Sequence, residues 1–143
     1  MDAASVFAIS AAGMAVERTR VEVAAMNLAH ANTVQESGGP AYRPLRVVPQ
    51  AGALPFTRAV DEGLAALSQP VVSVEDAAAA PRKVHDPGHP FADGQGYVAY
   101  PGVDTATEMV TLMSAMRAYE ANVAALNTAR TLALKTLEIG RGA

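Results

Sequence analysis

Hydrophobic positions follow a helical repeat from Asp104 to Gly140, a stretch without proline in which only Gly140 is glycine. Its apolar residues are separated alternately by three and four positions, which is the spacing of a coiled-coil seam. One set comprises Met109, Met116, Val123 and Leu137, with Arg130 as its interruption, and the other comprises Leu112, Tyr119, Leu126 and Ala133. We therefore predict one long helix here.

Both ends of this predicted helix carry termination signals. Thr105 and Glu108 have the spacing of a capping box, and Gly140 suits a left-handed residue that closes a helix. Further apolar residues lie outside the two sets, namely Met113, Ala121, Ala124, Ala129 and Leu134. A helix with apolar residues on more than one face needs more than one neighbour.

A second helix is predicted from Ser5 to about Asn32. One seven-residue repeat comprises Phe7, Met14, Val21 and Leu28, and another comprises Ile9, Val16 and Val23. The two repeats lie about 160° apart around the helix, since each residue advances it by about 100°. This helix too is expected to have partners on two sides.

The segment from Thr33 to Val103 has a different composition, because it holds all nine prolines and eight of the eleven glycines. Short strands are predicted at Tyr42–Val48, where Pro44 favours an edge or an end, at Pro70–Val74 and at Gly96–Tyr100. Thr57–Gln69 is ambiguous between helix and loop, and Asp76–Lys83 is predicted to be a flexible connection.

The predicted fold class is mainly α with a small β insertion. Paired, coiled-coil-like terminal helices flank a short, turn-rich β region. The helical core domain would comprise residues 1–33 and 104–143, and the insertion residues 34–103, with a flexible loop at about 50–83.

Composition and charge exclude several classes of protein. A 143-residue chain is normally one domain. A net charge of −3 without a basic run argues against nucleic-acid binding. The absence of cysteine excludes disulfides and thiolate sites. Ala3–Val16 is uncharged but too short to span a bilayer, and no positive charge precedes it as in a secretory signal. We expect no membrane span and no cleaved signal.

One cluster resembles a chemical site, and it comprises His85, Asp86, His89 and Asp93. On a helix, the two imidazoles could bind zinc, but Pro87, Gly88 and Pro90 prevent a helix here. A rigid turn in which a carboxylate caps local amides is the favoured interpretation. A hydrolase using Ser73 with His85 and Asp93 lacks a nucleophile elbow. We predict no enzyme activity, no cofactor and no metal.

Four asparagines lie on or near the predicted helices. Asn27, Asn122 and Asn127 could fix helix register by pairing across an interface, or they could face solvent. Asn32 suits a helix end. Arg130, on the predicted seam, could meet Glu17 or Glu22, or it could lie on a solvated rim.

Motifs of a known family occur in order along nearly the whole chain. The N-terminal signature comprises Asn27, Leu28, Ala29, Ala31, Asn32 and Thr33, followed by Tyr42 and Arg43. The central motifs comprise Asp86, Pro87, His89 and Pro90, then Gly96, Tyr97 and Val98, and the C-terminal ones Tyr119, Asn122, Val123 and Asn127. The chain thus resembles bacterial flagellar rod and hook axial proteins, and most narrowly their proximal rod subunits. His30, His85 and Gly102 depart from the usual pattern.

This resemblance implies a structural subunit of the flagellar basal-body proximal rod. Such subunits polymerise through their terminal helices into a helical drive shaft that transmits torque from motor to hook. Implied partners are copies of the chain, other proximal and distal rod proteins, the MS-ring/rod adaptor and the type III export apparatus. The implied location is the rod in the periplasm, reached without a cleaved signal peptide. Another axial rod or hook-type protein, or a soluble coiled-coil adaptor, is the alternative.

Overall fold

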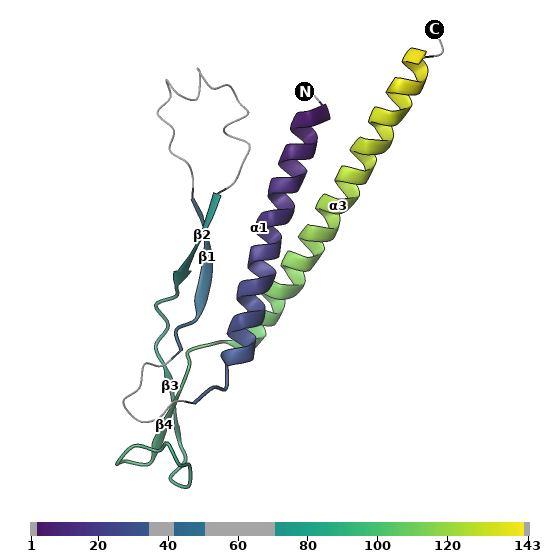
Figure 1. Ribbon diagram of the computed structural model, residues 1–143. Helices are drawn as coiled ribbons and strands as arrows, with labels where there is room; N and C mark the ends of the chain where they lie inside the picture. Colours follow the sequence, from purple (N-terminus) through teal and green to yellow (C-terminus); the bar gives the residue numbers. More distant parts are fainter. Residues whose placement is uncertain (1–2, 35–41, 51–70, 142–143) are drawn as a thin grey trace, which may run out of the picture. The chain divides into compact units, whose positions relative to one another are not determined.

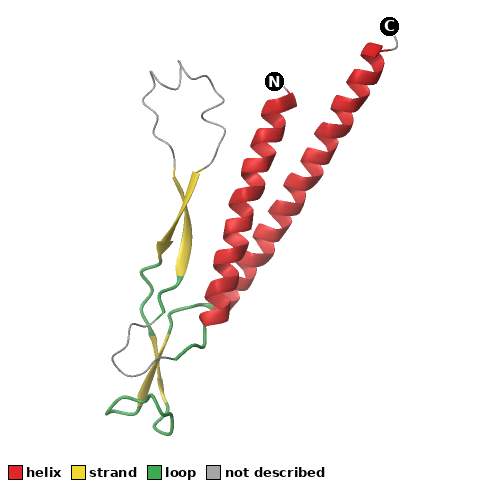
Figure 2. Ribbon diagram, viewed as in Figure 1, coloured by secondary structure: helices red, strands yellow, loops and turns green. Residues whose placement is uncertain are grey.

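The computed structural model describes residues 3–34, 42–50 and 71–141 (Figures 1 and 2). Its elements in chain order are α1 (Ala3–His30), β1 (Leu45–Gln50), β2 (Val71–Asp76), β3 (Arg82–His85), β4 (Tyr97–Tyr100) and α3 (Thr105–Arg141). Strand β1 pairs with β2, and β3 pairs with β4, as two separate two-stranded sheets. The predicted class, mainly α with a small β region between two long helices, is confirmed.

The chain divides into two compact units, and both helices contribute to both. One unit combines residues 1–19, 49–73 and 114–143, and the other combines residues 20–48 and 74–113. In each unit, a part of α1 meets a part of α3. The division of the chain into a helical core and an insertion stays a prediction.

Helix α1 begins at Ala3 and ends at His30, close to the predicted bounds. At its C-terminal end the backbone turns, because the Thr33 amide donates to the His30 carbonyl at 3.0 Å. The exposed Asn32 lies beyond this end.

The predicted capping box of Thr105 and Glu108 is wrong at the N-terminal end of α3. Asp104 caps this helix, since its carboxylate accepts the Ala106 amide at 3.1 Å and the Thr107 hydroxyl at 2.7 Å. Thr105 is already helical, and the Glu108 side chain bonds elsewhere. Asp104 is the better cap because it places its carboxylate one residue before the first helical turn. These hydrogen bonds, from Thr107 first and then Ala106, hold the pKa of Asp104 below its usual value.

The predicted closure of α3 at Gly140 is also wrong. Gly140 remains helical, and α3 continues to Arg141. Gly96 is the only glycine with a positive φ among the residues that the structure describes. A left-handed residue at Gly140 is therefore absent, and no described contact requires one at this exposed end.

The strands are partly as predicted. β1 begins one residue after Pro44 and runs past Val48, while β2 and β4 overlap their predicted ranges. The predicted connection at Asp76–Lys83 is wrong only at its ends. Residues 77–81 form neither helix nor strand, but Arg82–His85 is β3 and pairs antiparallel with β4, Val84 opposite Val98. Residues 71–83 of the predicted loop at about 50–83 thus hold β2 and the start of β3. Thr57–Gln69 lies outside the described residues.

Candidate functional site

The Asn27 side chain takes part in four hydrogen bonds. It is fully buried on α1. Its Oδ1 accepts the Tyr42 hydroxyl and the Leu45 amide, each at 2.8 Å. Its Nδ2 donates to the Leu45 carbonyl at 2.8 Å and to Glu108 Oε1 at 3.1 Å. A primary amide offers two donors and two acceptor lone pairs, so Asn27 uses its full capacity. We call these four residues the Asn27 node.

The node joins three segments that are distant in sequence. Tyr42 precedes β1, Leu45 is its first residue and Glu108 lies in the first turn of α3. The His30 ring stacks on Tyr42 with centroids 4.5 Å apart. Burial raises the pKa of the Tyr42 hydroxyl, and the Glu108 carboxylate raises it further. Tyr42 therefore stays protonated and donates its hydrogen bond throughout the neutral range.

One set of buried and half-buried positions on the two helices follows a heptad spacing, and its members are small, polar or charged. On α1 and at the first residue beyond its end, the buried or half-buried residues of this set are Ser10, Gly13, Glu17, Arg20, Ala24, Asn27 and Ala31. On α3, they are Glu108, Thr111, Ala115, Ala118 and Asn122. We call these twelve residues the inner seam. Small side chains let two helix backbones approach closely, and such seams escape a search for apolar repeats.

Gly13 and Asn122 form the closest described approach between the helices in the unit that contains both. A Cβ atom built on Gly13 would lie 3.0 Å from Asn122 Nδ2 and 3.1 Å from Asn122 Oδ1. Contacts that short are tighter than nearly all those of real Cβ atoms. The missing side chain of Gly13 is therefore the space that the Asn122 amide group occupies.

The residues predicted to pack on α3 lie largely outside the inner seam. Met109, Met116 and Leu137 are 58%, 49% and 64% exposed, and Tyr119 is 40% exposed. Leu112, Val123, Leu126 and Ala133 are half-buried, while Arg130 and Asn127 are exposed. On α1, Phe7, Met14, Val21 and Leu28 are half-buried. The exposed members of the apolar repeat are therefore not among the buried positions of the single chain, and their packing between subunits stays a prediction.

Other large apolar side chains are exposed as well. On α3 these are Val110, Met113, Leu132, Leu134 and Ile139, and on α1 they are Ile9 and Met26. Contiguous exposed apolar surface on a helix marks an interaction surface more often than chance exposure does. We call the exposed large apolar residues of α1 and α3 the outer apolar surface.

The cluster at His85–Asp93 forms a turn, as predicted. Asp93 accepts the amides of Gln95 and Tyr97, each at 2.9 Å, and the Tyr97 amide followed by the Gln95 amide lowers the pKa of Asp93. The capping carboxylate is thus Asp93, whereas Asp86 contributes its carbonyl, which accepts the His89 amide at 3.2 Å. No group of three or more histidine, aspartate or glutamate side chains suited to a metal occurs in residues 3–34, 42–50 and 71–141.

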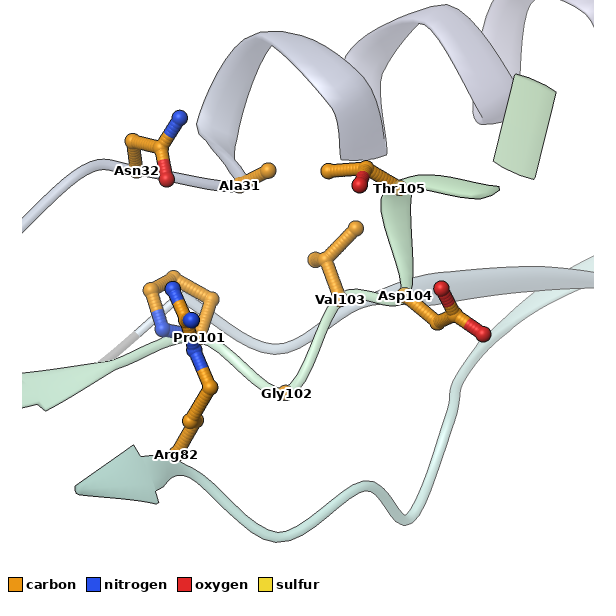
Figure 3. Close-up of a pocket in the computed structure, with 8 residues that line it drawn as sticks. All are labelled: Ala31, Asn32, Arg82, Pro101, Gly102, Val103, Asp104 and Thr105. Atoms are coloured by element: carbon orange, nitrogen blue, oxygen red, sulfur yellow. The ribbon is translucent and has the colours of Figure 1, made fainter. Parts of the chain in front are cut away.

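A hollow with a volume of about 590 Å³ lies around the start of α3 (Figure 3). Ala31 and Asn32 line it from the end of α1, Arg82 from β3, and residues 101–105 from the segment that enters α3. Asp104 is engaged in capping, and Arg82 lies 5.3 Å from the Tyr100 ring centroid. Among the described residues that line this hollow, none carries an imidazole and Asp104 is the one carboxylate. The lining therefore lacks a general base with an orienting partner.

Sequence reasoning did not identify Glu108 and Ala115 as inner-seam residues. Ala115 is fully buried and Glu108 binds Asn27. A usable signal exists in the repeat Glu108, Ala115 and Asn122, which recurs every seven residues like the apolar sets. A ranking by hydrophobicity hides this repeat, because methionine and leucine outrank its members in any such scale. In the described parts of the chain, neither helix has the length and apolar character needed to cross a membrane.

Relatives of this chain are found among flagellar basal-body rod proteins. The family model for the flagellar basal body rod FlgEFG protein C-terminal region matches residues 95–139. The flagellar basal-body rod protein FlgC of Salmonella typhimurium is 41% identical over 137 residues, which cover 96% of this chain and 97% of the relative. FlgC of Escherichia coli O157:H7 is 40% identical with the same coverage. FlgC of Aquifex aeolicus is 33% identical over 140 residues, again 96% and 97% of the two chains.

Proposed function

Since the chain belongs to the family of the flagellar basal-body rod protein FlgC, we propose that its outer apolar surface binds neighbouring subunits of the rod. The chain is a structural subunit of the basal-body rod. The observation that carries the proposal is the exposure of the predicted packing residues Met109, Met116 and Leu137. A neighbouring chain that covers these side chains would remove them from water.

The energetics of burial support this assignment. Burying apolar surface contributes about 25 cal/mol per Å², so a few large side chains per contact stabilise an interface substantially. Contacts between different patches of identical subunits generate a ring where the rotation between subunits closes, and a helical filament where it does not. A filament held by such contacts along two helices would serve as a drive shaft that transmits torque from motor to hook.

The partners follow from the same proposal. They are further copies of this chain, other proximal and distal rod proteins and the MS-ring/rod adaptor. The assembled rod would lie in the periplasm, and the chain would reach it through the flagellar type III export apparatus. The proposal includes no catalytic role, no cofactor and no nucleic acid.

A double substitution tests the proposal directly. Met113 and Met116 are 64% and 49% exposed and lie three residues apart on α3. In a strain that lacks its own copy of the gene, Met113→Glu/Met116→Glu should accumulate in cells but form no rods, and swimming should be lost. The carboxylates would have to be desolvated in every subunit contact, which is costly. Electron microscopy of isolated basal bodies and swim-plate diameter give the readout.

The matched control is Met113→Leu/Met116→Leu, which keeps the apolar area and should swim. Thermal unfolding of the isolated glutamate variant should match that of the natural chain, because both positions are exposed in the single chain. Normal basal bodies in the glutamate strain would refute the proposed interface. A different axial rod or hook-type protein would also match the family model over the C-terminal residues. No observation favours the other alternative, a soluble coiled-coil adaptor.

A further inference from the structure

Two contacts between α1 and α3, one in each unit, are compatible with a single antiparallel alignment. Gly13 meets Asn122, and Asn27 meets Glu108. Gly13 and Asn27 are 14 residues apart on α1, and Glu108 and Asn122 are 14 apart on α3, which is two heptads in both cases. We propose that these two contacts fix the register of the helix pair and exclude alignments shifted by one heptad.

The alanines of the inner seam do not specify an alignment. Ala24 on α1, Ala31 just beyond its end, and Ala115 and Ala118 on α3 are identical in size. A shift of seven residues would place Ala118 instead of Thr111 opposite Ala24, at little cost in packing at that position. In coiled coils, a single polar residue on the seam is what selects one register over its neighbours.

The contact at Gly13 selects the register by shape. Gly13 is the sole glycine of α1, so the Asn122 amide group finds enough space at one height of that helix. A shift by one heptad in either direction would place Asn122 opposite Val6 or Arg20 instead. Both side chains would occupy the volume that Gly13 leaves empty.

The contact at Asn27 selects the same register by hydrogen bonding. Glu108 Oε1 accepts from Asn27 at 3.1 Å, and Asn27 is fully buried. A shift in one direction would place Ala115 opposite Asn27, and a shift in the other would place Pro101, which lies before the helix begins. Neither residue has a side chain that accepts a hydrogen bond. A buried donor without a partner is strongly unfavourable.

The absence of cysteine makes register measurable by disulfide trapping. In the observed alignment Ala24 stands opposite Thr111, and both line one small hollow. In the shifted alignment Ala24 stands opposite Ala118. Mild oxidation of the purified full-length chain should therefore link Ala24→Cys/Thr111→Cys and leave Ala24→Cys/Ala118→Cys unlinked.

Removing both register contacts should change this ratio. In Gly13→Leu/Asn27→Leu, the 24–111 product should fall relative to the 24–118 product by about tenfold or more, since one unsatisfied buried group is worth that factor. Ala15→Leu, at an exposed position of α1, is the control and should leave the ratio unchanged. An unchanged ratio in the double variant overturns the proposal, as does linkage of the 24–118 pair in the natural background.

A milder pair of variants tests the shape contact if the double variant fails to fold. Replacing glycine by alanine inside a helix normally stabilises it. Gly13→Ala should instead lower the thermal midpoint, and adding Asn122→Ala should raise that midpoint above the natural value. A higher midpoint for Gly13→Ala alone would show that Asn122 needs no space there, which overturns this half of the proposal. These measurements use the isolated chain and do not depend on rod assembly.

Discussion

Two regions, the surroundings of Asn27 and the C-terminal part of α3, depart in opposite ways from the burial of side chains that is usual in a globular protein. The Asn27 side chain is polar, yet it is fully buried. In the C-terminal part of α3, Leu137 and Ile139 are 64% and 75% exposed although they are apolar. Polar groups usually lie outside and large apolar groups inside. Directional contacts thus hold the buried Asn27, whereas large apolar side chains of α3, the strongest source of burial energy, are exposed.

The difference separates two requirements. Hydrogen bonds and close steric contacts are directional, so they define how the segments of one chain meet. Apolar burial has no direction and contributes more free energy for a given area. A subunit that forms its own shape with the first kind of contact retains the second kind for its neighbours. No buried side-chain nitrogen or oxygen among the described residues lacks a hydrogen-bond partner, as this division requires.

The largest effect on the isolated chain is expected at Asn27. Asn27→Ala would leave the Tyr42 hydroxyl, both backbone groups of Leu45 and the Glu108 carboxylate without this partner. We expect a loss of about 3 kcal/mol in the free energy of unfolding, since each unsatisfied buried group costs about 1–3 kcal/mol. Urea unfolding followed by circular dichroism measures this loss.

Asn127→Ala is the matched control, because Asn127 is an exposed asparagine on α3. It should change the free energy of unfolding by less than about 0.5 kcal/mol. Equal losses in both variants would show that the Asn27 node does not stabilise the chain.

A smaller effect is expected from the two capping aspartates on acidification. The pKa values of Asp93 and Asp104 are lowered from 3.8 by the groups that donate to them. The unfolded chain therefore takes up protons first as the pH falls, so the folded state loses stability below about pH 3.8 and continues to lose it through the lowered pKa values. The thermal midpoint should fall over this range.

Asp93→Asn/Asp104→Asn distinguishes this cause from general acid unfolding. Asparagine caps a helix about as well as aspartate but does not titrate. The acid-induced decrease in the thermal midpoint should be smaller in this variant than in the natural chain. Identical pH profiles would mean that other carboxylates determine the acid response.

The smallest effect is expected on the outer apolar surface. Leu137→Gln should change the free energy of unfolding of the isolated chain by less than about 0.5 kcal/mol, because the leucine is already 64% exposed. Urea unfolding gives the value directly. A loss above about 1 kcal/mol exceeds what a substitution at an exposed position normally causes. It would mean that Leu137 packs within the single chain, so the contrast between the C-terminal part of α3 and the surroundings of Asn27 would not hold.

The two long helices could be predicted from the sequence because their pattern is local and repeats many times. β3 could not, because Arg82–His85 follows an alanine run and its strand character comes from pairing with Tyr97–Tyr100. The Asn27 node was inaccessible for a similar reason. Its partners lie 15, 18 and 81 residues away, so no spacing rule connects them. The methionine and leucine repeats did not indicate that Ser10 and Ala115 would be buried, and packing of the apolar repeats between subunits stays a prediction.

The span of the Asn27 node determines when the fold can be completed. Tyr42 and Leu45 follow Asn27 closely, whereas Glu108 lies 81 residues further along. A helix forms within about a microsecond, so α1 can form as soon as its residues are available. Closing an 81-residue loop costs about 1.5 kcal/mol more than closing a 15-residue loop, and it requires most of the chain to be present. We therefore expect the hydrogen bond between Asn27 and Glu108 to form after those that Asn27 makes with Tyr42 and Leu45.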